Sequence, residues 1–156
     1  MTNIYFPDEK ITFNDLYFVC YMIERTARHV KQHNRYVVER IGREALAHQL
    51  SIAQTNHCLN PEQVVADWVS QYRIERGNVD VTRVNPLYTD RYPTPLQMGK
   101  VYARLIDSVT PDDGNYVDTM LKVYASPICE KLDDYNCSAY YEPSYVQRQA
   151  YYDGHF

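Results

Sequence analysis

The stretch TFNDLYFVCYMIERTARHV, residues 12–30, decides the fold class. Thr12, followed three residues later by Asp15, predicts a capping box at the start of a helix. Between positions 16 and 23 apolar residues nearly surround the helix axis, so this helix is expected at the centre of the core. Its apolar stripe recurs at steps of three and four and contains Phe13, Leu16, Tyr17, Cys20, Ile23, Ala27 and Val30.

Similar start signals recur further along the chain. Asn60-Pro61 and Thr94-Pro95 each place a capping side chain before a proline at the first helical position. Thr110-Pro111, followed by two acidic residues, predicts another helix start by the same logic. Each signal precedes an apolar pattern with helical spacing, so we expect three helices to begin at these points.

The remaining segments complete a mainly helical pattern. Asn34 is expected to cap a second helix that continues to about residue 53, with an interruption at Gly42. Pro127 ends one helix or opens a short one through Leu132, and a last helix is expected from about 143 to 152.

These patterns predict an all-α protein, a compact bundle of about six or seven helices. A long irregular connection is expected near residues 77–94, where prolines punctuate the chain and three valines indicate a short extended piece. A length of 156 residues suits a single domain, 1–156. We expect its helical halves, 12–73 and 95–152, to share one core across the connection 74–94.

Charge is distributed unevenly along the chain, although the formal net charge is only −4. Residues 1–78 contain nine Lys/Arg and nine Asp/Glu, whereas residues 106–156 contain three and nine. The acidic balance argues against a dedicated nucleic-acid-binding domain, which is usually strongly basic. The acidic last third indicates charge complementarity with the basic stretch of the first half, within one molecule or between copies.

The sequence favours a cytoplasmic location. The first residues lack the basic and apolar segments of a signal peptide, and the longest apolar run, residues 16–23, has eight residues. A membrane span needs about 18 apolar residues, so no contact with a membrane is expected. The four cysteines, at positions 20, 58, 129 and 137, form no CxxC motif and are expected to be reduced thiols.

Motif tests for catalysis fail. The chain has no GxSxG elbow and no GxxxxGK loop, so we assign no catalytic residue and no cofactor and favour a non-enzymatic role. One alternative is an enzyme or metal protein built from His29, His33, His57 and Cys58. His29 and His33 are four apart on a predicted helix, so their rings would share one side. The stretch is basic and lacks the glutamate of an HExxH motif, so no metal is expected.

A second alternative is a nucleic-acid-associated regulator. It would use the basic face of residues 25–43, on which we single out Arg25, Arg28, Lys31 and Arg35 as phosphate contacts. Glu24, Glu39 and Glu44 partly neutralise this face, which is also typical of an ordinary solvated helix surface.

Tyrosine is over-represented, with 16 copies against four Phe and one Trp. Its ring combines apolar area with a polar tip, and it is enriched at the centres of protein interfaces. We therefore expect a protein–protein interaction module that associates with itself, as a homodimer, through its C-terminal segment. The expected interface residues are Tyr135, Tyr140, Tyr141, Tyr145, Tyr151, Tyr152 and Phe156. The alternative is that these aromatic side chains close the core of the same molecule from outside.

Four features between positions 16 and 72 also suggest a relationship. They are the run FVCYMIE (18–24), a Val-rich second helix, the corner Asn56-His57-Cys58, and EQVVADWVSQY (62–72). On these features the segment resembles a bacterial family of short helical domains of unknown function. The family's histidine-threonine corner is histidine-cysteine here. The resemblance implies a bacterial protein that accompanies neighbouring gene products, some of them similar to ADP-ribosyltransferase-like proteins.

Overall fold

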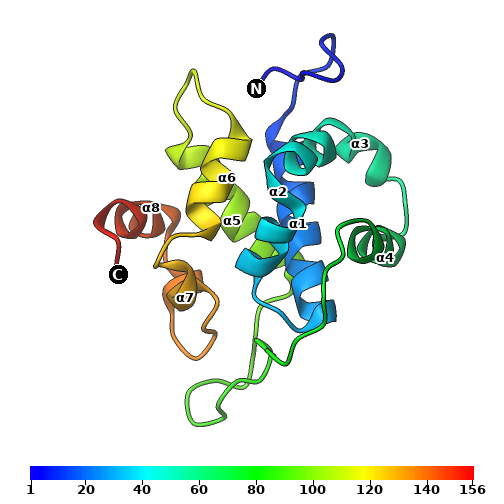
Figure 1. The fold of residues 1–156 in the computed structure, drawn as a ribbon. Helices are drawn as coiled ribbons and strands as arrows, with labels where there is room; N and C mark the ends of the chain where they lie inside the picture. The colour runs from blue at the N-terminus through cyan, green and yellow to red at the C-terminus, as the bar shows by residue number, and fades with distance from the viewer.

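The computed structural model describes residues 1–156 and is all-α, as the sequence predicts (Figure 1). It has eight α-helices instead of six or seven, because the four-residue α3 is a separate helix after α2; the short α7 ends at Leu132, as one expected alternative had it. The elements are α1 (Phe13–Val30), α2 (Asn34–Ser51), α3 (Ala53–Asn56), α4 (Pro61–Gln71), α5 (Pro95–Val109), α6 (Tyr116–Tyr124), α7 (Cys129–Leu132), the 3-10 helix η1 (Ala139–Tyr141) and α8 (Ser144–Asp153).

Helix α1 lies at the centre of the bundle, with α2, α4 and α5 packed around it (Figure 1). The predicted capping box is present: the Asp15 N–H donates to the Thr12 hydroxyl at 3.4 Å, and the Thr12 N–H donates to the Asp15 carboxylate at 2.8 Å. The helix ends where Lys31 adopts a left-handed conformation, with φ of 56°.

Both halves of the chain contribute to the core. Its 34 buried apolar residues form one cluster that includes Leu16 of α1, Trp68 of α4, Tyr102 of α5 and Met120 of α6. Burial of apolar surface contributes about 25 cal/mol per Å² removed from water, so this shared cluster stabilises the two halves together. No helix combines the length and the apolar character needed to cross a bilayer.

Two glycines fix how neighbouring segments meet the central helix. A Cβ atom on Gly99 of α5 would lie 2.7 Å from the Cα of Tyr21, so the helices α1 and α5 approach closely at that point. A Cβ atom on Gly77 would lie 2.6 Å from the Lys31 carbonyl oxygen. The Gly77 N–H donates to the Val30 carbonyl at 2.7 Å, which attaches the connection after α4 to the end of α1.

The starts of α4 and α5 are as predicted, but the start predicted at Thr110 is wrong. Thr110 ends α5 instead: its N–H and its hydroxyl both donate to the Ile106 carbonyl, at 3.0 and 2.6 Å. Proline is common just after a helix end as well as at a helix start, so Pro111 is compatible with either role for Thr110. The next helix, α6, begins at Tyr116, where the Asn115 side chain accepts from the Asp118 N–H at 2.9 Å.

Other local predictions have mixed outcomes. Gly42 interrupts α2 as expected, with φ of 79° and ψ of 171°. The connection between α4 and α5 is irregular as expected, but the valine-rich part of it forms no strand. His33, not Asn34, is the N-cap residue of α2, and the Asn34 side chain points into the bundle.

Candidate functional site

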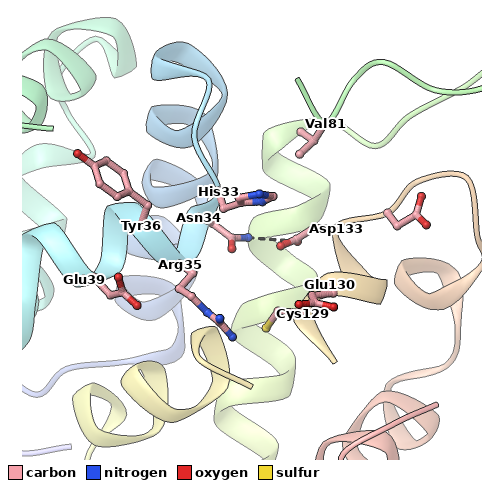
Figure 2. A pocket seen from close by; sticks show the side chains of 10 residues that line it. His33, Asn34, Arg35, Tyr36, Glu39, Val81, Cys129, Glu130 and Asp133 are labelled. Carbon is pink, nitrogen blue, oxygen red and sulfur yellow. Dashed lines mark hydrogen bonds between the residues drawn. The ribbon is translucent and has the colours of Figure 1, made fainter. Parts of the chain in front are cut away.

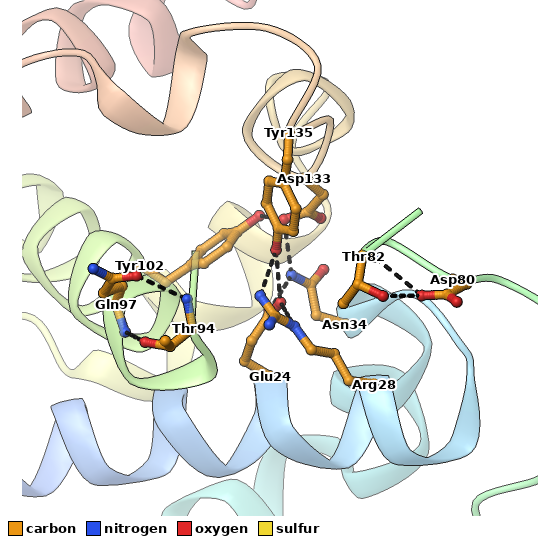
Figure 3. A network of polar contacts seen from close by, with 10 residues as sticks. All are labelled: Glu24, Arg28, Asn34, Asp80, Thr82, Thr94, Gln97, Tyr102, Asp133 and Tyr135. Carbon is orange, nitrogen blue, oxygen red and sulfur yellow. Dashed lines mark hydrogen bonds and ion pairs between the residues drawn. The ribbon is translucent and has the colours of Figure 1, made fainter. Parts of the chain in front are cut away.

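Six polar side chains from α1, α2, α5 and the segment around the end of α7 meet inside the bundle (Figure 3). Together they form the buried polar network, which consists of Glu24, Arg28, Asn34, Tyr102, Asp133 and Tyr135. Glu24 and Arg28 are four apart on α1, so they share one face of the helix, and both bond to the Tyr135 hydroxyl.

Glu24 is the centre of one half of this network. Its Oε1 accepts from the Arg28 Nε–H at 3.2 Å and from the Tyr135 hydroxyl at 2.9 Å. Arg28 also donates to the Tyr135 oxygen at 3.0 Å, and its guanidinium lies over the Tyr135 ring. Burial and the charge of Glu24 raise the pKa of Tyr135, so its hydroxyl remains a donor at neutral pH.

Asp133 is the centre of the other half. Its Oδ1 accepts from the Tyr102 hydroxyl at 2.7 Å and from the Asn34 amide at 3.1 Å. The same amide donates to Glu24 Oε2 at 3.3 Å and so bridges the two carboxyl groups. Burial, together with the negative charge of Glu24, raises the pKa of Asp133 to about 8.

The raised pKa of Asp133 predicts a pH-dependent stability. An unfolded aspartate has a pKa near 3.8, so from about pH 4 to about pH 8 the folded chain holds a proton that the unfolded chain has lost. Stability therefore falls as pH rises through this window. The variant Asp133→Asn lacks this titration and serves as the reference. In urea unfolding at several pH values, we expect the unfolding free energy of the wild type to fall by about 2 kcal/mol or more relative to this variant across the window. If the difference in unfolding free energy between the wild type and Asp133→Asn does not change with pH, the raised pKa of Asp133 is contradicted.

A pocket of about 440 Å³ opens beside the network (Figure 2). Its walls are the first turns of α2, from His33 to Glu39, and the segment from Cys129 to Asp134. Asn34 and Asp133 belong both to the network and to the pocket. Burial raises the pKa of the Cys129 thiol to about 12, so this pocket residue is no thiolate nucleophile at neutral pH.

The four cations of the expected nucleic-acid face all have partners within the chain. Arg28 points into the polar network, and Arg35 donates to the carbonyls of Tyr124 and Ala125 at the end of α6, at 3.2 and 2.7 Å. Arg25 lies 3.8 Å from Glu62, and Lys31 lies 3.9 Å from Asp80. Arg28 and Arg35 therefore do not project outward as expected. Arg28 is held by the buried Glu24 carboxylate, and Arg35 by the carbonyls at the C-terminal end of α6.

The histidine and cysteine candidates do not converge. His29 and His33 are both exposed, but they do not share a helix as predicted, because α1 ends at Val30 and His33 is the N-cap residue of α2. His57 packs its ring against Phe18, with centroids 5.3 Å apart. The exposed thiol of Cys58 lies 3.6 Å from the Gln54 carbonyl oxygen. No three His, Cys, Asp or Glu side chains form a group that could hold a metal ion.

The seven expected interface aromatics divide into two groups. Tyr135 is buried in the polar network, and Tyr140 and Tyr151 pack against the core, so these three fit the alternative that they close the core. The others project into solvent, with exposed fractions of 83% for Tyr141, 73% for Tyr145, 58% for Tyr152 and 43% for Phe156.

The sequence contained one signal for the polar network that its interpretation missed. Glu24 lies four residues after Cys20 and three before Ala27, so it occupies a position on the apolar stripe of α1. A charged residue at such a position predicts a buried, partnered carboxylate. Asp133 offered no comparable signal, because adjacent aspartates are common at helix ends.

The segments behind the family resemblance serve mainly to pack the fold. FVCYMIE belongs to α1, and EQVVADWVSQY covers most of α4, whose Val64, Val65 and Trp68 are buried in the core. Comparison of the chain with protein-family models, with curated proteins and with solved structures found no match.

Proposed function

We propose that the protein is a protein-interaction module that binds a second copy of itself through the aromatic face of α8. This face consists of Tyr145, Arg148, Tyr152 and Phe156, with Tyr141 just before the helix. The observation that supports the proposal most directly is the exposure of four aromatic side chains within sixteen residues of sequence. Such clusters on a surface are typical of interaction sites.

The way α8 docks leaves this face uncovered. Only Gln147 and Ala150 are buried, and the Gln147 amide donates to the carbonyls of Ala139 and Tyr140 at 3.0 and 3.1 Å. Tyr145, Arg148 and Tyr152 recur at steps of three and four, so they form one stripe away from the docked side. Figure 1 shows α8 at the edge of the bundle.

The face is shaped to receive another side chain. Arg148 lies over the Tyr152 ring, 5.7 Å from its centroid, which holds both groups in place. A hollow of about 620 Å³ lies along the stripe and is lined by Tyr145, Arg148, Tyr152 and Phe156 among others. A tyrosine from a facing α8 fits such a hollow, because its apolar ring can pack against the aromatic side chains while its hydroxyl group reaches a polar partner.

Charge favours a second copy as the partner. In a twofold interface the same patch faces itself, so a strongly charged patch would repel its own copy. Residues 106–143 contain two Lys/Arg and eight Asp/Glu, whereas residues 144–156 contain one Arg and one Asp. The acidic excess of the last third thus lies outside α8, and the aromatic face is close to neutral.

Sedimentation velocity over a range of protein concentrations tests this proposal. We expect the wild type to form dimers as concentration rises and the double variant Tyr145→Ser, Tyr152→Ser to remain monomeric, because the truncation removes both interface rings. The matched control is Tyr88→Ser, Tyr92→Ser, which removes two exposed tyrosines of the connection between α4 and α5. If both double variants dimerise like the wild type, the aromatic face of α8 is not the interface.

A further inference from the structure

We propose that the pocket between α2 and α7 binds a small organic cation that presents ammonium or guanidinium N–H groups. This site is independent of the aromatic face of α8, and it carries a different function. A volume of about 440 Å³ is within the range of small-molecule sites. The proposal rests on the charge of the pocket and on one buried oxygen atom that has no hydrogen-bond donor.

The walls of the pocket carry an excess of carboxyl groups. Glu39, Glu130, Asp133 and Asp134 line it, and none of them takes part in the five ion pairs of the chain. The one guanidinium in the lining is that of Arg35, whose Nε and Nη2 donate to the carbonyls at the end of α6. The carboxylates of Glu39, Glu130 and Asp134 outnumber this guanidinium, so a cation is attracted to the pocket.

The floor of the pocket supplies the second observation. Asn34 is 4% exposed, and its NH₂ group donates to both Glu24 and Asp133. This fixes the orientation of the amide and leaves its carbonyl oxygen buried with no donor. Figure 2 shows that oxygen turned away from Asp133, toward the space that the lining residues enclose.

An unpartnered buried carbonyl costs about 1–3 kcal/mol, and nearly all such groups in proteins have a partner. A ligand N–H that reaches Asn34 would supply the missing donor, and the Asp133 carboxyl group beside it would accept a second one. The pocket thus offers acceptors at its floor and negative charge at its rim. Ammonium and guanidinium groups carry several donors and a positive charge, and they match this arrangement.

A metal ion fits the pocket less well than an organic cation. No three of its acidic, histidine or cysteine side chains are grouped closely enough to coordinate a metal. The carboxyl groups are instead distributed between α2, which carries Glu39, and the segment that carries Glu130 and Asp134. Opposed acidic walls of this kind suit an extended ligand with more than one cationic group.

Isothermal titration calorimetry of the full chain with spermidine and with agmatine tests the proposal. We expect saturable binding of one ligand per chain at low salt, and no binding of tetramethylammonium, which carries the charge without N–H donors. Glu39→Gln and Glu130→Gln change exposed side chains, so the fold is preserved, and each is expected to weaken binding about threefold.

Glu44→Gln is the matched control, because Glu44 is an exposed carboxylate of α2 that lies outside this pocket. It should leave the affinity unchanged. The proposal is overturned if neither probe binds saturably, or if tetramethylammonium binds as well as spermidine. It is equally overturned if Glu39→Gln and Glu130→Gln bind like Glu44→Gln, since the attraction would then be general surface electrostatics.

Discussion

The variant Arg28→Met is expected to lose about 3–5 kcal/mol of unfolding free energy at neutral pH. Methionine keeps most of the aliphatic stem, so the change removes mainly the guanidinium. Glu24 then remains buried beside Asp133 with no cation bonded to it. Removing one partner of a buried ion pair is costly because the remaining charge has lost both its water and its counter-ion.

Arg25→Met is the matched control for this prediction. Arg25 lies one turn earlier on α1, and its partner Glu62 is 3.8 Å away with a side chain that is 80% exposed. Exposed pairs contribute about 0–1 kcal/mol, so this variant should unfold almost like the wild type. Adding Glu24→Gln to Arg28→Met removes the uncompensated charge and should recover part of the loss. Equal losses for Arg28→Met and Arg25→Met in urea unfolding would contradict the polar network.

Gly99→Ala is expected to destabilise the protein by about 2–3 kcal/mol. The new methyl carbon would lie 2.7 Å from the Cα and 2.8 Å from the N of Tyr21, which are backbone atoms in the middle of α1. Backbone atoms cannot rotate away as a side-chain end can, so α1 and α5 must separate. The extensive contact between these helices would be disturbed along its length.

The sign of the Gly99 effect makes the test decisive. In a helix with free space around the glycine, alanine would stabilise by about 1 kcal/mol through its higher helix propensity. Lys100→Ala, at the next and exposed position of α5, provides the comparison, and we expect little change there. A Gly99→Ala variant more stable than the wild type in thermal and urea unfolding would rule out the close approach of the two helices.

Local signals predicted the helices well, because capping is decided within a few residues. Thr94 with Gln97 closes a capping box at α5, as Thr12 with Asp15 does at α1. The same local reading failed at Thr110, because a proline follows helix ends as readily as it begins helices.

The polar network could not be predicted from the sequence as a whole, because its partners are far apart along the chain. Asn34 and Asp133 are separated by 99 positions, and Glu24 and Tyr135 by 111. Spacing within one helix places Glu24 on the buried side of α1, but only the docking of distant segments in the folded chain brings Asn34 and Tyr135 to it. The pocket beside the network arises from the same docking.

The outward aromatics of α8 were predicted as a group but not individually. Helix α8 carries tyrosines on two sides, and its apolar pattern is too weak to show which side packs inward, that of Tyr151 or that of Tyr145 and Tyr152. The distinction comes from the side-chain hydrogen bonds of Gln147, which fix the rotation of α8 about its axis.

Light scattering behind size exclusion, at low and high salt, tests the proposed self-association most directly. A contact between nearly neutral aromatic faces is apolar, so its strength should depend little on ionic strength. We expect a mass that rises with concentration toward twice 18.4 kDa and changes little with salt. A mass of one chain at every concentration and both salt levels would contradict the proposal that α8 joins two copies of this protein.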